Sequence, residues 1–141
     1  MTDRVLIVTG GSRGIGAATC RLAGQRGYAV VVNYNRDGAA GAAVVAEIEA
    51  AGGTAIAIQA DVAREAEIER LFAETDDRLG RVTHLVNNAG ITGRGQRLDV
   101  VEAATLEAIF DLNILGCFLC AREAVRRMST AHGGSGGASR L

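Results

Sequence analysis

The sequence contains no lysine and no proline, and only 4% of its 141 residues are aromatic. All 15 basic residues are arginine, so a reaction step that needs a lysine amine is not available within these residues. The many alanines favour helices, and the 19 glycines favour tight turns between them. The composition therefore indicates a chain of helices separated by glycine turns.

Cysteine is also scarce. Cys20, Cys117 and Cys120 are too few and too irregularly spaced for the disulfide scaffold of a small secreted protein. No apolar run approaches the roughly 20 residues that span a bilayer. The 16 acidic residues nearly cancel the basic ones, which leaves no field to attract nucleic acid or an anionic membrane. We expect a soluble cytoplasmic protein with neither of these partners.

Apolar runs alternate with helical patterns along the chain. The strands are expected at residues 4–9, 29–33, 54–59 and 84–87, and the helices at residues 17–26, 38–51, 64–79 and 101–128. Strands without polar alternation, separated by helices, are typical of a parallel sheet covered on both faces. The sequence predicts a doubly wound α/β domain over residues 4–130. Residues 131–141 have the glycine- and serine-rich composition of a flexible tail.

A glycine-rich turn, TGGSRGIG, occupies residues 9–16 between the first strand and the first helix. Glycines let the backbone approach a pyrophosphate closely, and a helix N-terminus offers unpaired N–H groups to an anion. The spacing TGxxxGxG differs from the common GxGxxG, and it lacks the GK[ST] of a phosphate-loop NTPase. An ordinary structural turn is the alternative in a chain this rich in glycine.

The turn resembles the glycine motif of the short-chain dehydrogenase/reductase family, and three later segments resemble that family in the same order. They are Asp61-Val62, NNAG at residues 87–90 and NILG at residues 113–116. The resemblance covers about residues 4–130. It implies a Rossmann-like fold with strand order 3-2-1-4 and the N-terminal portion of an oxidoreductase. The relatives that it suggests are NADP-dependent oxoacyl reductases and sugar dehydrogenases, which interconvert small carbonyl and alcohol substrates.

The resemblance also implies roles for individual residues. Asp61 would accept a hydrogen bond from the adenine amino group, and Asn113 would be the catalytic residue that helps to hold a proton-relay water. The cofactor-binding residues would be Gly10, Ser12, Arg13, Gly14, Ile15, Gly16, Asn35, Arg36, Asp61, Val62, Asn88, Ala89 and Gly90.

Some of these residues also have simpler interpretations. Asp61 follows a strand, where an aspartate commonly caps the next helix, and the Asn87-Asn88 pair could close a turn. Asn113 lies in an apolar helix, where a polar side chain needs a partner. Cys117 and Cys120 form a CxxC, but within a helix they are expected to be small core residues, so no metal site is predicted.

The second strand ends in Asn33-Tyr34-Asn35-Arg36, without the acidic residue that NAD-selective domains use to bind the ribose 2′-hydroxyl. Arg36 and Arg13 could both reach a 2′-phosphate, although Asp37 weakens the local field. The alternative is that both arginines are simply solvated. The pattern favours NADP(H) over NAD(H) as the cofactor.

Proton transfer in this family uses a tyrosine, a lysine four residues later and a serine. Neither Tyr28 nor Tyr34 is followed by lysine, and Ser129, Ser135 and Ser139 lie at or beyond the last helix. The chain is therefore expected to end within the fold and to be inactive alone.

A fourth strand left at the edge would expose Leu85 and Val86 and invite pairing, so a homo-oligomer is expected. Two alternatives remain, an NADP(H)-binding module without turnover and a fragment that associates with itself or with a complementary half.

Overall fold

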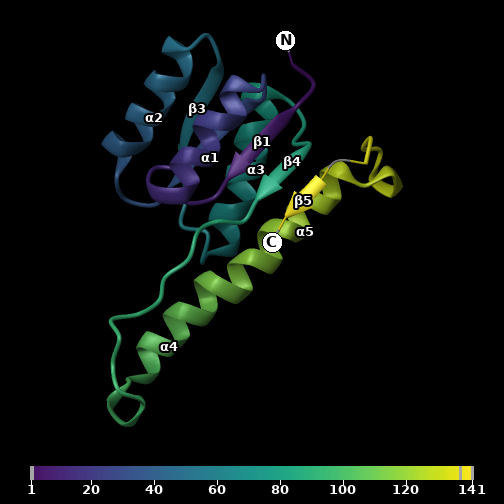
Figure 1. The fold of residues 1–141 in the computed structure, drawn as a ribbon. Helices are drawn as coiled ribbons and strands as arrows, with labels where there is room; N and C mark the ends of the chain where they lie inside the picture. The colour runs from purple at the N-terminus through teal and green to yellow at the C-terminus, as the bar shows by residue number, and fades with distance from the viewer. Residues whose placement is uncertain (1, 137, 141) are drawn as a thin grey trace.

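All the predicted strands form, and they pair in parallel in one sheet (Figure 1). The computed structural model describes residues 2–136 and 138–140. The strands are β1 (Val5–Val8), β2 (Ala29–Tyr34), β3 (Thr54–Gln59), β4 (His84–Val86) and β5 (Ala138–Arg140), in the spatial order β3-β2-β1-β4-β5. In the register of the sheet, Ile7 of β1 lies beside Val31 of β2 and Leu85 of β4.

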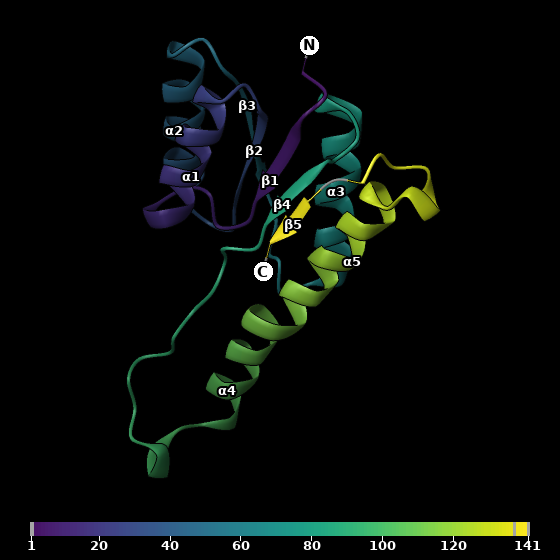
Figure 2. The same cartoon turned by 45° about the vertical axis from the view of Figure 1, so that its right-hand side comes forward.

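Helices cover both faces of the sheet, as the unalternated strands predicted. Figure 2 shows α1 and α2 on one side of the strands and α3 and α5 on the other. The helical segments are α1 (Gly14–Gln25), α2 (Gly38–Ala50), α3 (Glu65–Leu79), η1 (Leu98–Val100), α4 (Ala103–Phe110), η2 (Asp111–Gly116), α5 (Cys117–Met128) and η3 (Thr130–His132). The fold is a three-layer sandwich.

The core has two apolar clusters, one on each face of the sheet, because successive strand side chains point to opposite faces. Leu6 and Val8 of β1 pack with α1 and α2, whereas Ile7 between them packs with α3 and α5. The largest buried side chain, Phe72 of α3, belongs to the second cluster. Strands β1, β2 and β3 each contribute to both clusters and therefore connect the two helical layers.

The predicted strand order 3-2-1-4 is confirmed, but the prediction of an open edge at β4 is wrong. Residues 138–140, expected within a flexible tail, form β5, and His84 and Leu85 of β4 lie beside Ala138 and Ser139. The strand is only three residues long and carries no apolar run, so strand periodicity did not reveal it. Gly137 and Leu141 of the predicted tail lie outside the described residues.

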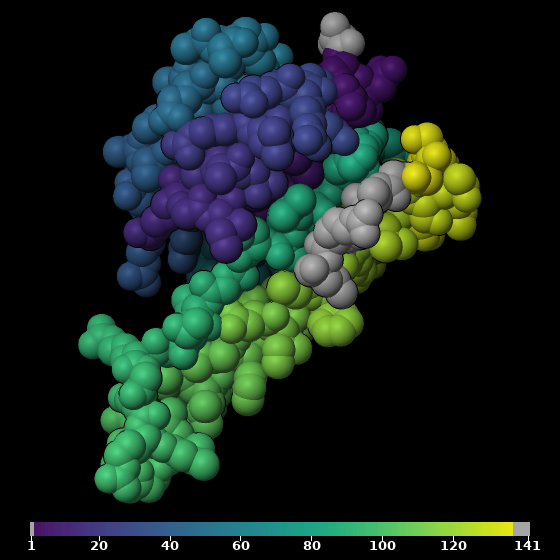
Figure 3. Space-filling view, viewed as in Figure 1, coloured from purple at the N-terminus to yellow at the C-terminus, as the bar shows by residue number. Residues whose placement is uncertain are grey.

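The last helix continues from Ala103 to Met128 through η2, which is a π-helical segment. Its 26 residues are long and apolar enough to cross a membrane by length and composition, which corrects the expectation that no such run exists. Its second half packs on α3 and β4 as part of the domain. Figures 1 and 3 show its first half, α4, and the preceding loop extending beyond the sheet.

Candidate nucleotide-binding site

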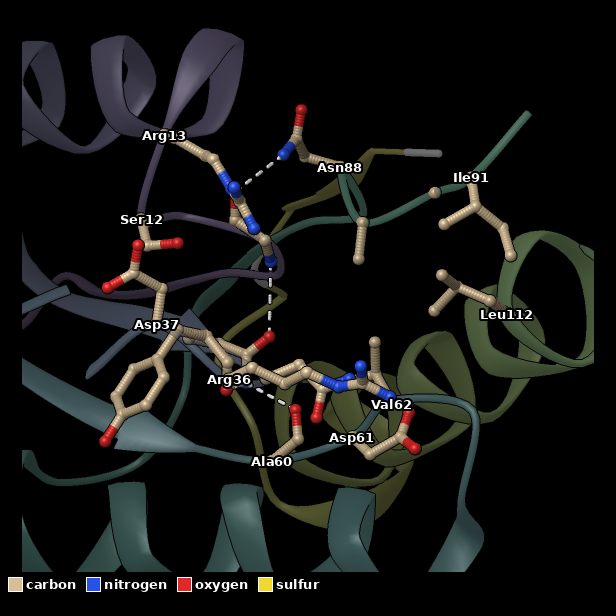
Figure 4. Close-up of a pocket in the computed structure, with 16 residues that line it drawn as sticks. Ser12, Arg13, Arg36, Asp37, Ala60, Asp61, Val62, Asn88, Ile91 and Leu112 are labelled. Carbon is tan, nitrogen blue, oxygen red and sulfur yellow. Dashed lines mark hydrogen bonds between the residues drawn. The ribbon is translucent and has the colours of Figure 1, made fainter. Parts of the chain in front are cut away.

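A cavity of about 360 Å³ opens where the carboxyl ends of the strands meet (Figure 4). Ligands of open α/β sheets bind at this edge, beside the point where the strand order reverses. Here the reversal lies between β1 and β4, which flank the glycine turn. The cavity is lined by Gly10, Ser12, Arg13, Asn33, Tyr34, Asn35, Arg36, Asp37, Ala60, Asp61, Val62, Asn88, Ala89, Gly90, Ile91 and Leu112.

The glycine turn has a geometry that only glycine permits. Gly10 adopts φ +61°, and a Cβ on Gly16 would lie 2.2 Å from the carbonyl oxygen of Gly10. The helix that follows has no acidic residue in its first turn and no side-chain hydrogen bond at its N-cap, Arg13. Its N-terminal N–H groups and the positive end of its dipole are therefore available to an anion, which fits the pyrophosphate of a dinucleotide.

Two side chains hold the turn against the end of β4. The hydroxyl of Thr9 accepts hydrogen bonds from the backbone N–H groups of Asn88 and Ala89, both at 3.0 Å. The side-chain amide of Asn88 donates to the carbonyl oxygens of Thr9 and Gly10, also at 3.0 Å. Asn88 thus does more than close its own turn, because it fixes the wall of the cavity.

The two predicted arginines lie on different walls of the cavity. Arg13 extends from the start of α1 and Arg36 from the loop after β2, and both are exposed (Figure 4). The carboxylate of Asp37 accepts a hydrogen bond from Ala40 N at 3.0 Å and caps α2. Part of its charge is therefore matched by the dipole of α2, and the cation that faces the cavity from this loop is Arg36.

Asp61 orders a loop beside the cavity and does not cap a helix. Its Oδ1 accepts a hydrogen bond from Ala63 N at 3.0 Å, which orders the loop between β3 and α3. The residue at the N-cap of α3 is Arg64, so Asp61 is not the helix cap. Asp61 and Val62 both line the cavity at the end of β3.

Four predicted site residues lie outside the cavity lining. Gly14, Ile15 and Gly16 form the first turn of α1, and the side chain of Ile15 is 81% exposed. Asn113 lies in η2, where its Oδ1 accepts from Ile91 N at 2.8 Å and its Nδ2 donates to Ile91 O at 2.6 Å. The amide therefore has the partner that its apolar surroundings demanded, and it anchors the loop that follows β4.

Sequence reasoning did not assign six residues of the lining to the site: Asn33, Tyr34, Asp37, Ala60, Ile91 and Leu112. Asn33 had a detectable signal, because it is polar at the end of the apolar run AVVVN. Ile91 and Leu112 have no such signal, since apolar residues in a loop and a helix fit many structures equally well.

The glycine turn after β1, the parallel sheet and the cavity at its carboxyl edge define the chain as a Rossmann-like α/β domain. A family model described as short chain dehydrogenase matches residues 4–136. The chain belongs to this family, whose members bind nicotinamide cofactors, and it is an oxidoreductase domain by family.

Several known proteins are similar to the chain. A 3-oxoacyl-[acyl-carrier-protein] reductase of Synechocystis is 46% identical over 128 residues, which are 91% of this chain and 51% of that protein. The uncharacterized oxidoreductase YgfF of Escherichia coli is 42% identical over 134 residues, which are 95% of this chain and 54% of that protein. The crystal structure of a metagenomic short-chain oxidoreductase in complex with NADP matches with a TM-score of 0.85 at 36% identity, covering 91% of this chain and 57% of that one. The chain spans about half the length of these curated relatives.

Proposed function

We propose that the chain is the NADP(H)-binding portion of an oxidoreductase that interconverts small carbonyl compounds and alcohols. The observation that carries this proposal is the placement of Arg13 and Arg36 on two walls of one cavity, beside the N-terminus of α1. Guanidinium groups form strong charge-assisted hydrogen bonds with a phosphate. The NADP complex of the metagenomic relative adds support, as does the reductase among the curated relatives.

The lining residues divide the work of binding. The α1 N-terminus would receive the pyrophosphate, Arg13 and Arg36 the 2′-phosphate, and Asp61 the adenine amino group. Ala89 and Gly90 would lie along the middle of the dinucleotide. Bound NADP(H) supplies the hydride that the reaction exchanges with the substrate.

We propose further that these 141 residues do not catalyse turnover alone. Tyr34 lies at the end of β2 and Tyr28 just before that strand, and these residues contain no lysine that could pair with either tyrosine in proton transfer. The alternative is a binding module without turnover. In both cases, purified chain with NADPH and a panel of small ketones should show no loss of absorbance at the NADPH band. A steady rate that Asn113→Ala abolishes would contradict this inactivity.

Arg36→Ala tests the choice of cofactor. We expect this change to weaken NADPH binding by about ten- to a hundredfold, because one charge-assisted hydrogen bond contributes about 1.5–3 kcal/mol. NADH binding should change little, since NADH has no 2′-phosphate. Isothermal titration with each cofactor measures both effects, and binding of NADPH to the unaltered chain is expected in the micromolar range or weaker.

Arg78→Ala is the matched control for that titration, because Arg78 is exposed on α3 and absent from the cavity lining. It removes the same charge and should leave both affinities unchanged. Equal losses for NADPH and NADH in Arg36→Ala would refute the 2′-phosphate role.

We propose that the chain forms a homo-oligomer through its last helix. An apolar stripe is exposed along this helix and consists of Leu106, Phe110, Ile114, Leu115, Phe118 and Val125. Exposed apolar patches of this kind mark interaction surfaces. The charges of the helix favour a second copy as the occupant. Glu107 and Asp111 lie near its start, and Arg122 and Arg126, which also pair with Glu123 of the same helix, lie near its end.

An antiparallel, two-fold arrangement of two such helices would match these charges. Both pairs, Glu107 with Arg126 and Asp111 with Arg122, are centred on the same point of the helix, so one symmetry axis satisfies both. We expect size-exclusion chromatography and light scattering to show a dimer. Glu107→Arg should weaken this dimer, because it places the new arginine of one copy beside Arg126 of the other.

Leu98→Ser is the control for the stripe, because Leu98 is exposed in η1 and lies outside it. Phe118→Ser should give a monomer, whereas Leu98→Ser should not. A monomer at high concentration of the unaltered chain would overturn the proposal.

We also infer that the protein works in the cytoplasm. Its three cysteines are free, and two of them are buried in different core clusters. A reducing compartment keeps thiols in this form.

A further inference from the structure

Asn33 is a polar side chain buried at the end of β2, where it is only 1% exposed. Its Oδ1 accepts a hydrogen bond from Gly10 N at 3.2 Å. Its Nδ2 donates to the carbonyl oxygens of Ala60 at 3.1 Å and of Ile58 at 3.3 Å. One buried amide therefore touches the glycine turn and the end of β3 together.

The backbone reinforces the same connection. The carbonyl oxygen of Asn33 accepts a hydrogen bond from Gly11 N at 2.7 Å, and Tyr34 O accepts one from Ala60 N at 2.9 Å. The dashed lines of Figure 4 follow this network from Asn88, across the turn, to Ala60. In the proposed function, the turn inside this network would receive the pyrophosphate, and the end of the network at Ala60 would lie beside the adenine.

Gly10 N–H is thereby directed into the protein. Because Asn33 occupies the donors of both Gly10 and Gly11, the N–H groups left for an anion are those that come later, at the start of α1. The orientation of the Gly10 peptide sets the path of the residues after it, and Gly16 leaves this peptide almost no room to shift.

We propose that Asn33 is the positioning residue of the nucleotide site. It fixes the distance between the pyrophosphate turn and the adenine wall at Ala60-Asp61, and so sets the affinity for the adenosine half of the cofactor. This inference rests on the proposed function. Asn33 itself does not contact the reacting atoms.

An amide is the side chain that this position requires. It combines an acceptor for Gly10 with donors for two carbonyl oxygens, and a buried polar group that loses such partners is costly. In Asn33→Leu, which has nearly the same shape, every one of these bonds is lost. In Asn33→Asp, the acceptor for Gly10 remains, but a carboxylate faces the carbonyl oxygens of Ile58 and Ala60.

The test measures binding of NADPH and of 2′,5′-ADP, which contains only the adenosine half. Asn33→Leu and Asn33→Asp should each weaken both ligands about tenfold or more. Thr75→Val is the matched control, because Thr75 is equally buried and loses its hydrogen bond to Leu71 O on α3, away from the cavity. It should lower the melting temperature and leave both affinities unchanged.

Hydrogen exchange at the Gly10 amide provides a readout that does not depend on the ligand. The amide should be protected in the unaltered protein and in Asn33→Asp, and it should exchange freely in Asn33→Leu. Rapid exchange of this amide in the folded, unaltered protein would overturn the proposal, even if neither variant folds.

The outcomes also separate this inference from the proposed function. If the unaltered chain binds neither NADPH nor 2′,5′-ADP, the proposed function fails. If it binds both and a folded Asn33→Leu binds them equally well, the positioning role fails while the function stands.

Discussion

Glu123 is the residue whose environment departs most from what its type predicts, because its carboxylate is buried at 5% exposure. Arg126 and Arg127 donate hydrogen bonds to it at 2.8 and 2.9 Å. Burial alone would raise the pKa of Glu123, but the hydrogen bond from Arg127 and the charges of the nearby arginines outweigh it and lower the pKa. Arg127 also pairs with Asp76 of α3, so this cluster fastens α5 to α3.

Glu123→Gln should destabilise the protein by about 3 kcal/mol, because it removes the acceptor charge of a buried ion pair. Urea unfolding measures this cost. The control is Glu65→Gln, which disturbs an exposed pair with Arg122 and should cost about 0.5 kcal/mol or less. Similar costs for the two variants would contradict the role of burial.

The same residue gives stability a dependence on pH. Since the pKa of Glu123 is lower in the folded state, its stabilisation is complete above the unfolded pKa of about 4.3 and is lost as the pH falls through the folded value. Glu123→Gln should therefore flatten the acid limb of the stability curve.

At the scale of elements, the π-helical segment η2 contains the residues through which the last helix contacts the cavity lining. A Cβ on Gly116 would lie 2.2 Å from the carbonyl oxygen of Val62, so the helix touches the loop after β3 through a bare glycine. Asn113, in the same segment, holds Ile91 on the opposite side. The segment thus supports two parts of the cavity lining, Val62 and Ile91.

Gly116→Ala should move the helix away from Val62, because the collision is with backbone. We expect a loss of stability of about 1–3 kcal/mol and weaker NADPH binding. Gly52→Ala is the control, since Gly52 has φ +84° but open space around it. The control should cost about 1–2 kcal/mol through backbone strain and leave binding unchanged. Thermal unfolding and titration of both variants measure the difference, and unchanged NADPH affinity in Gly116→Ala would refute the coupling.

At the scale of the whole molecule, one sheet holds two apolar clusters, and each contains a buried thiol. Cys20 belongs to the α1–α2 face and Cys120 to the α3–α5 face, and burial raises the pKa of each to about 12. Cys117 is only partly buried. Because β1, β2 and β3 each contribute buried residues to both clusters, we expect the two faces to unfold together.

Thiol labelling checks this expectation. One thiol per chain, Cys117, should react in the folded protein, more slowly than a free thiol because burial raises its pKa as well. Cys20 and Cys120 should react later and at a common rate, set by cooperative unfolding. Cys117→Ser should remove the fast phase, and different rates for the two core thiols would show that the faces open separately.

The sequence alone determined the βα units and the glycine turn, because these depend on local apolar runs and on motifs with fixed spacing. The strand order followed from the resemblance to the short-chain dehydrogenase/reductase family. It identified Arg13, Arg36 and Asp61, which lie directly after strands and therefore meet at one edge of a parallel sheet. The roles assigned to these residues remain predictions.

Only the tertiary structure decided the rest. Strand β5 exists through pairing with β4 and has no pattern of its own. The buried bonds of Asn33, the contact of Gly116 with Val62 and the charge cluster around Glu123 join residues about 20 to 60 positions apart. Such contacts are set by how the elements pack in space, whereas periodicity and motif spacing describe only residues that are close along the chain.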